Sequence, residues 1–412
     1  MTYNLTTSTF SSTLPNLIET YLPSSLHPFF LLSYPIHPKA HSFLRLASTS
    51  NHNVVGQILY DKGYKDIYYS ISWAIIFTLL RSFTMNYVFQ PFASYILDRN
   101  RRIELKQKKK KIKGGGAEVE VVVEESKKEK KHKKHLVTRF SEQGWSMLYC
   151  TVFWTLGMFT LYSVPSPTSP EQLWGTYPYT PLPALTKFYY LAQLGWWFHQ
   201  IYVINTEKRR KDHWQMFGHH ILTITLIVTS YIANFTRIGV VIHVLMDFCD
   251  IFLPLAKMLR YLSYSRSCDL TFVIFLISWL FSREIGLFLV IKTSYLDAPR
   301  FIQFKWSPST GQYLTYRTYL GFIGLVSLLW VLASIWFYMA VKVAVKVVRG
   351  QGAEDSRSDD EDEDGPTEDG DGDGEVLGDV PQSVGTTANG ISNGHSHSNG
   401  NGNADGTLKK RK

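Results

Sequence analysis

Two histidines and two carboxylates lie in apolar segments of this chain, where charged and polar groups are costly. His219 and His220 open one apolar run, and Asp247 and Asp250 lie inside the next one. Ionisable groups placed within lipid-spanning segments usually mark a functional site. Imidazole exchanges protons near neutral pH and can also act as a nucleophile. These four residues are therefore the first candidates for catalysis.

Helical spacing predicts that the four side chains meet. Residues three, four and seven apart share one face of a helix, so His243, Asp247 and Asp250 line a single face. The two apolar runs are joined by a turn at 234–238, which makes them antiparallel neighbours. We expect the paired histidines and the two carboxylates to share a cavity, with the basic run Lys208–Lys211 at its mouth.

Other interpretations of these polar residues exist. Intramembrane His and Asp also hydrogen-bond neighbouring helices, and a lone histidine is more often explained in this way. Two His and two Asp on adjacent antiparallel helices favour a site instead. A proton-relay transporter is a further alternative, but the sequence shows no inverted repeats or paired broken helices. No metal is expected, because membrane diiron enzymes need many histidines and the apolar runs supply only His199, His219, His220 and His243.

The apolar runs that carry these residues predict an all-α polytopic membrane protein. A membrane-spanning helix needs ~20 predominantly apolar residues. The mean hydropathy of −0.08 over 412 residues hides this pattern, because it averages apolar runs with very polar segments. About seven spans are expected, at Ile67–Leu97, Trp145–Val164, Leu185–Ile204, Met216–Phe235, Ile238–Met258, Leu270–Ile291 and Tyr316–Val345.

The distribution of basic residues predicts the orientation in the membrane. Positively charged loops stay in the cytosol, and the connection at 99–139 holds sixteen Lys or Arg. This pattern favours a lumenal N-terminus and a cytosolic C-terminus. The final Lys409–Lys412 resembles a dilysine signal for return to the endoplasmic reticulum, so we expect a multi-pass protein of that membrane.

Five segments are predicted along the chain. Charge-dense sequence cannot bury enough apolar area to fold alone, and residues 354–375 hold thirteen Asp or Glu. The segments are a lumenal N-terminal segment (1–66), a first transmembrane helix (67–97), a charged cytosolic linker (98–139), a domain with six transmembrane helices (140–348) and a disordered acidic tail (349–412).

The sequence around the paired histidines resembles a known family. The stretch Lys208–Thr223, continued to Leu253, is similar to the Lag motif of ceramide synthases, which are membrane N-acyltransferases built on the TLC domain. Lys62–Asp66 and Lys187–Gln193 also resemble family positions, and the likeness covers roughly 61–348. Met246 before Asp247 is typical of fungal members. The resemblance implies a bundle of helices around a lipid-binding cavity.

The resemblance also implies a reaction and roles for the candidate residues. A ceramide synthase transfers a fatty acyl group from acyl-CoA to the amino group of a sphingoid base, sphinganine or phytosphinganine, and forms (dihydro)ceramide. It implies a covalent acyl-histidine on His219, assisted by His220. Asp247 and Asp250 would orient a histidine and hold the ammonium or hydroxyl groups of the base.

The implied partners are small molecules and lipids. Arg209, Arg210 and Lys211 are candidates to bind the phosphates of coenzyme A, although they are also ordinary positive-inside residues. We expect acyl-CoA as co-substrate, no permanently bound cofactor, contact with membrane lipids and no nucleic acid; a homodimer or a small accessory subunit stays open. The family likeness also connects the loop at 292–317 with acyl-chain length. The alternative is a non-catalytic TLC-domain protein of lipid sensing, cargo handling or transport.

Overall fold

The structure is a computed structural model. It describes residue 18 and residues 20–36, 58–113, 126–163, 166–175, 177–178, 181–207 and 212–349. The chain divides into two units, residues 1–361 and 362–412, and every described residue belongs to the first. The predicted acidic tail therefore lies outside the described residues, apart from Arg349.

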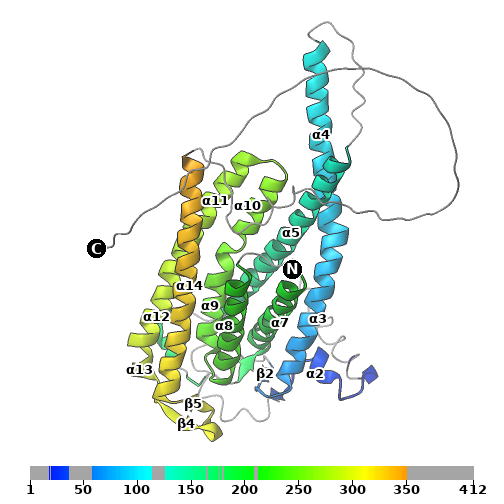
Figure 1. Cartoon of the computed structure of the whole chain (residues 1–412). Helices are drawn as coiled ribbons and strands as arrows, with labels where there is room; N and C mark the ends of the chain where they lie inside the picture. The colour runs from blue at the N-terminus through cyan, green and yellow to red at the C-terminus, as the bar shows by residue number, and fades with distance from the viewer. Residues whose placement is uncertain are drawn as a thin grey trace, which may run out of the picture. The chain divides into compact units, whose positions relative to one another are not determined.

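Long helices make up most of the described chain (Figure 1). They are α3 (Asp66–Thr84), α4 (Gln90–Lys113), α5 (Lys127–Tyr162), α7 (Ala184–Thr206), α8 (His213–Ile232), α9 (Thr236–Cys249), α10 (Phe252–Tyr261), α11 (Ser265–Trp279), α12 (Leu287–Leu296) and α14 (Tyr316–Val348). Two π-helical segments, η3 (Met85–Phe89) and η4 (Leu280–Gly286), join α3 to α4 and α11 to α12.

Short elements gather at one end of the bundle (Figure 1). The helical ones are α2 (His27–Phe30), α6 (Pro170–Trp174), α13 (Ala298–Phe301) and η5 (Pro308–Thr310). The strands β1 (Pro35–Ile36), β2 (Leu59–Tyr60) and β3 (Leu182–Pro183) pair antiparallel, and β4 (Lys305–Ser307) pairs with β5 (Gln312–Leu314) as a hairpin. We call this the hairpin end, and the opposite end, which carries α10, the α10 end.

The apolar runs predicted from the sequence all fall on long helices, but the number of membrane spans stays a prediction. By length and composition, three described helical stretches can cross a membrane, namely Thr236–Tyr261, Ser265–Phe301 and Tyr316–Lys346. The prediction of a mainly helical membrane protein is confirmed at this level. In the segment before the first predicted span, residues 26–36 are mainly apolar but too few to cross a membrane, and they contain α2 and β1 at the hairpin end.

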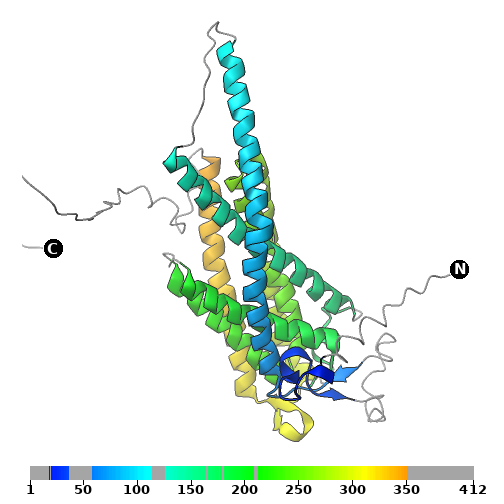
Figure 2. The same ribbon diagram turned by 90° about the vertical axis from the view of Figure 1, so that its right-hand side faces the viewer.

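The charged linker is more helical than its composition suggested. Helix α4 continues to Lys113 and α5 starts at Lys127, so only 114–125 of this region lie outside the described residues (Figure 2). Ser126 and Glu129 form a capping box at the start of α5. Ion pairs join Lys133 to Asp98 at 2.6 Å and Arg101 to Glu129 at 3.2 Å. Charged residues remain solvated on an exposed helix, and therefore helicity here requires little buried apolar area.

The predicted fifth span is broken where Asp250 lies. Helix α9 ends at Cys249 and α10 begins at Phe252, so Asp250 is the C-terminal cap of α9 and not an interior residue. Pro254 explains the break. A proline ring clashes with the carbonyl group four residues earlier, and here that carbonyl belongs to Asp250.

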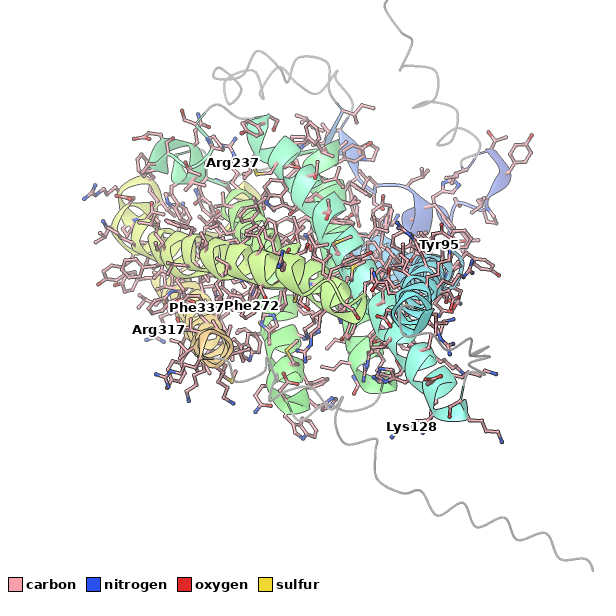
Figure 3. All side chains as sticks on the ribbon, turned by 90° about the horizontal axis from the view of Figure 1, so that it is seen from above. Tyr95, Lys128, Arg237, Phe272, Arg317 and Phe337 are labelled. Carbon is pink, nitrogen blue, oxygen red and sulfur yellow. The ribbon has the colours of Figure 1, made fainter. Side chains whose placement is uncertain are left out.

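Aromatic side chains fill the centre of the bundle. The Phe77 ring lies edge-on to Tyr149, Phe153 and Trp196, with centroid distances of 5.6, 5.7 and 5.6 Å. Such edge-to-face pairs are a favoured arrangement of aromatic rings. At the α10 end, Phe272 of α11 and Phe337 of α14 pack against one buried cluster (Figure 3). These contacts fix α3, α5 and α7 against one another, and α11 against α14.

A buried ion pair anchors the hairpin end. Asp66 Oδ1 lies 2.8 Å from Lys187 Nζ, and their side chains are 3% and 0% exposed. Lys187 Nζ also donates to the carbonyl oxygens of Ser33 and Asp61 at 2.8 and 2.6 Å, and Tyr231 Oη donates to Asp66 Oδ2 at 2.8 Å. The pair thus joins the N-terminal segment, α3, α7 and α8.

Lys62 ties the same end to the turn between α8 and α9. Its Nζ donates to the Tyr231 carbonyl at 3.0 Å and to Asn234 Oδ1 at 2.7 Å. Burial lowers the pKa of the Lys62 amine to about 7. Asn234 Nδ2 donates in turn to the Gly311 carbonyl at 2.6 Å, next to β5.

Removing one member of the buried pair should destabilise the whole bundle. We expect Lys187→Ala or Asp66→Ala to cost about 3–5 kcal/mol, because each leaves an uncompensated buried charge. The double variant should cost less than the sum of the two. Thermal unfolding of the detergent-purified variants measures this. Lys65→Ala, an exposed neighbour, is the control; equal effects at Lys65 and Lys187 would contradict the assignment.

Candidate active site

Two cavities adjoin in the interior of the bundle. One has a volume of about 380 Å³ and many polar lining residues; the other has about 100 Å³ and is lined mainly by apolar side chains. We call them the polar cavity and the apolar cavity. They share five lining residues, namely Trp197, His219, Asp247, Asp250 and Arg283.

The order of residues along the helices places the cavities one behind the other. On α8, the residues that line the polar cavity fall between His213 and His220, and those that line the apolar cavity fall between His219 and Ser230. On α14, Trp336 and Ala340 line the first, whereas the lining residues of the second fall between Tyr319 and Leu329. The polar cavity therefore lies toward the α10 end and the apolar cavity toward the hairpin end, with His219 at their junction.

The paired histidines differ in their surroundings. The His219 ring lies edge-on to the rings of Trp197 and Trp336, at 5.5 and 5.2 Å, and its buried Nδ1 has no hydrogen-bond partner among the described residues. His220 Nδ1 lies 2.6 Å from the Met216 carbonyl oxygen. A carbonyl only accepts, so Nδ1 of His220 donates and, in the neutral ring, Nε2 carries the free lone pair.

Gln193 of α7 holds Asp247. Its Nε2 donates to Asp247 Oδ2 at 2.8 Å, and its Oε1 accepts from Tyr149 Oη at 2.7 Å. The second contact fixes which way the amide faces, since only the amide oxygen accepts a hydroxyl proton. Both Gln193 and Asp247 are buried. The Asp247 carboxylate is thus fixed in position by a neutral donor.

Asp250 is paired with a cation. Its Oδ2 lies 2.5 Å from Arg283 Nη2, which also donates to the Met246 carbonyl at 2.7 Å. The guanidinium carbon lies 4.4 Å from the centre of the Trp279 ring. Arg283 is buried, whereas the side chain of Asp250 is 40% exposed. The structure therefore pairs Asp250 directly with a cation, whereas the hydrogen bond that Asp247 accepts comes from a neutral amide.

The structure brings together all four residues first selected from the sequence. His219, Asp247 and Asp250 line both cavities, and His220 lines the polar one. Their catalytic roles stay predictions. His243 lies on α9 with Asp247 but lines only the apolar cavity, and its Nδ1 donates to the Gly239 carbonyl at 2.7 Å. Arg209, Arg210 and Lys211 lie outside the described residues.

Two functional candidates escaped the sequence analysis. Arg283 is an ionisable residue inside the predicted sixth span, so the cost of burying charge could have identified it by the same argument that identified the histidines. Gln193 is uncharged and gives no such signal. Within the described ranges, no group of three His, Cys, Asp or Glu side chains is arranged to hold a metal ion.

Comparison with known proteins identifies the family. Residues 139–342 match the TLC domain (TRAM, LAG1 and CLN8). Sphingosine N-acyltransferase lag1 of Schizosaccharomyces pombe is 37% identical over 331 residues, 80% of this chain and 75% of that protein. Ceramide synthase LAG1 of Saccharomyces cerevisiae is 28% identical over 351 residues, 82% and 77% of the two chains. Ceramide synthase 5 of Homo sapiens is 32% identical over 230 residues, 55% and 56% of the two chains.

These similarities extend beyond one motif. The match to the fission-yeast protein covers most of both chains, and the matched TLC domain includes every residue that the two cavities share. The likeness seen in the Lag motif is thereby confirmed. The chain belongs to the ceramide synthase family of TLC-domain acyltransferases.

Proposed function

We propose that this chain transfers a fatty acyl group from acyl-CoA to the amino group of a sphingoid base, through an acyl-histidine on His219. The observation that carries the proposal is the position of His219 at the junction of a polar and an apolar cavity. An acyl-CoA has a hydrophilic head and an apolar tail, joined at the thioester. The two cavities suit these two parts, and the junction suits the reacting carbon.

The reaction proceeds in two balanced steps. An imidazole nitrogen of His219 attacks the thioester carbon, the C–S bond breaks, and coenzyme A leaves as the thiolate. The amine of the base then attacks the acyl-imidazole, the C–N bond to His219 breaks, and an amide forms. The ammonium group of the base must lose two of its three protons, one before and one after its attack, and the free Nε2 lone pair of His220, the residue next to His219, can accept one of them.

The two carboxylates serve different purposes in this proposal. Asp250 is already paired with Arg283 and fixes the wall of the site. Among the described residues, Asp247 forms no ion pair and accepts a hydrogen bond from the neutral Gln193 amide, so it is the better partner for the ammonium or hydroxyl groups of a sphingoid base. A charge-assisted hydrogen bond to such a group is roughly twice as strong as a neutral one.

The phosphates of coenzyme A would lie at the α10 end. Glu207 and Asp212 both line the polar cavity. The basic residues Arg209, Arg210 and Lys211 lie between these two cavity-lining residues in the sequence. These cations are the proposed phosphate ligands, and acyl-CoA is a co-substrate and not a bound cofactor.

His219→Ala should abolish ceramide formation. Loss of a nucleophile or a general base costs about 10²-fold or more in rate. Membranes from cells that express the wild type or the variant at equal levels are given acyl-CoA and sphinganine, and ceramide is measured by mass spectrometry. With acyl-CoA alone, purified wild type should release one CoA thiol per site and carry the acyl mass on the His219 peptide.

His199→Gln is the matched control. His199 is a buried histidine of α7 that packs against Phe77, Trp145 and Trp196 and lines neither cavity. The His199→Gln variant should still release CoA thiol from acyl-CoA and still form ceramide. If ceramide forms but no acyl adduct is found, the proposed transferase activity stands and the proposed covalent intermediate is wrong. A correctly inserted wild type that makes no ceramide would favour a non-catalytic lipid-binding role.

Gln193→Leu should lower kcat while the protein remains folded. The change removes the donor that fixes Asp247, and a misplacement of about 1 Å at a reacting group costs up to about 10²-fold. Steady-state kinetics and melting temperature are measured together. Asn205→Leu, an exposed position on the same helix, should leave kcat unchanged. Equal kcat in wild type and Gln193→Leu would show that this hydrogen bond has no part in the reaction.

We also propose seven spans in the endoplasmic reticulum membrane, with the hairpin end lumenal and the α10 end cytosolic. The basic termini of α4 and α5 support this orientation, because basic segments stay in the cytosol. Acyl-CoA would then enter from the cytosol. A homodimer or an accessory subunit remains a prediction about assembly.

The orientation can be tested with the natural acceptor Asn4-Leu5-Thr6. In the proposed topology Asn4 is lumenal, so it carries a glycan that Asn4→Gln removes, visible as a shift on a gel. A C-terminal tag should be digested by protease in intact microsomes. Protection of the C-terminal tag, or digestion of an N-terminal tag, would indicate the opposite orientation in the membrane.

A further inference from the structure

Aromatic rings close the apolar cavity at the hairpin end. Phe235, which follows α8, lies edge-on to Phe322 of α14 at 5.0 Å and to Trp174 of α6 at 5.9 Å. All three residues line the cavity, and Phe235 and Trp174 are 6% and 4% exposed. Phe235 and Trp174 also belong to a buried apolar cluster whose members Leu173, Ala298, Ile302 and Leu314 do not line the cavity. The cavity therefore ends at these rings, which we call the aromatic floor.

The floor lies at a defined depth from the proposed nucleophile. His219 and Ser230 both line the apolar cavity from α8. Ser230 follows His219 by eleven positions, which corresponds to about 16.5 Å of helix at 1.5 Å per residue. Phe235 follows at the end of this helix. An acyl chain bound at His219 and extended along α8 would meet the Phe235 ring with its methyl end.

The backbone holds Phe235 firmly in this position. The N–H of Phe235 donates to the Ser230 carbonyl at 2.8 Å, and Asn234 is left-handed with φ 64°. This is the hydrogen-bond pattern of a Schellman motif, in which the residue after the left-handed one is directed back against the helix. Lys62 and the Gly311 carbonyl hold the Asn234 side chain from two sides. The floor is thus fixed from outside the cavity.

The loop between α12 and α14 contributes less directly to the lining of the apolar cavity. Among the described residues that line the apolar cavity, none falls between 295 and 318; Ser294 and Tyr319 are the nearest. Tyr319 Oη donates to the Ser294 carbonyl at 2.8 Å. The hairpin reaches the cavity through Tyr319 and through the bond from Asn234 to Gly311. Its side chains, such as the exposed Trp306, do not touch the space that a chain would occupy.

We infer that the aromatic floor, Phe235 with Trp174 and Phe322, sets the longest acyl chain that the enzyme transfers. The inference rests on the proposed function, because it assigns the apolar cavity to the acyl group. A chain that is too long must displace a packed ring or withdraw its thioester from His219. One methylene too many in an apolar pocket costs about 1–3 kcal/mol, or 10–200-fold in kcat/KM. The limit should therefore be sharp.

The test compares acyl-chain profiles. Membranes with wild type, Phe235→Ala or Trp174→Leu receive an even-numbered series of saturated acyl-CoAs at fixed sphinganine. Each truncation should raise kcat/KM at least about tenfold for the first chain that the wild type rejects. Val326→Phe adds a ring to the cavity wall between His219 and the floor. It should shift the optimum to shorter chains, which a variant that is merely unstable would not do.

Trp306→Ala is the control, because it removes an equally large aromatic side chain from the hairpin without touching the cavity. It should keep the wild-type profile. An unchanged profile in Phe235→Ala and Trp174→Leu, while ceramide is still made, would overturn this inference and leave the proposed function intact. A second series varies the length of the sphingoid base at fixed acyl-CoA. If the truncations extend the accepted base instead, the cavity holds the base and the inference is wrong.

Discussion

The ion pair between Asp250 and Arg283 joins the break after α9 to the π-helical turn η4. Asp250 caps a helix that Pro254 forces to end, and Arg283 lies in a segment whose wider turn shifts the register of the following side chains. A buried guanidinium is tolerated only when it is paired. The pair therefore requires both irregularities to face each other, and the carboxylate of Asp247 and the ring of His219 lie around the same point.

A second ion pair, buried on both sides, fixes the bundle at its other end. Asp66 and Lys187 hold the N-terminal segment, α3, α7 and α8 at the hairpin end. The apolar cavity extends between the level of this pair and that of Asp250 and Arg283. The two ion pairs hold the helices at two fixed heights. If one helix slipped along another, a pair would break and leave a charge buried without a partner. The length of the apolar cavity is thus set by electrostatics as much as by packing.

The sequence predicts which ionisable residues line the two cavities better than it predicts the backbone around them. His219, His220 and Asp247 are recognisable because ionisable groups in apolar runs are costly, and the short turn at 234–238 makes their helices antiparallel. Pro254 marks an interruption, but only the clash with the carbonyl four residues earlier locates the break at Asp250. The π-helical turns η3 and η4 leave no pattern in residue types. Gln193 could not be selected from the sequence for a different reason. Its place in the site depends on hydrogen bonds to Tyr149 and Asp247, which lie on other helices.

In the proposed mechanism, the junction of the two cavities also gives a reason why one histidine could serve both substrates. The thioester carbon must lie where an apolar tail changes to a solvated head, and the amine of a sphingoid base lies at the same kind of boundary in its own molecule. Both reacting atoms therefore favour the level of His219, while both tails favour the apolar interior. In a covalent mechanism the two substrates need not occupy that level together, because coenzyme A departs before the amine attacks. A single cavity with a single boundary is then sufficient for the whole reaction.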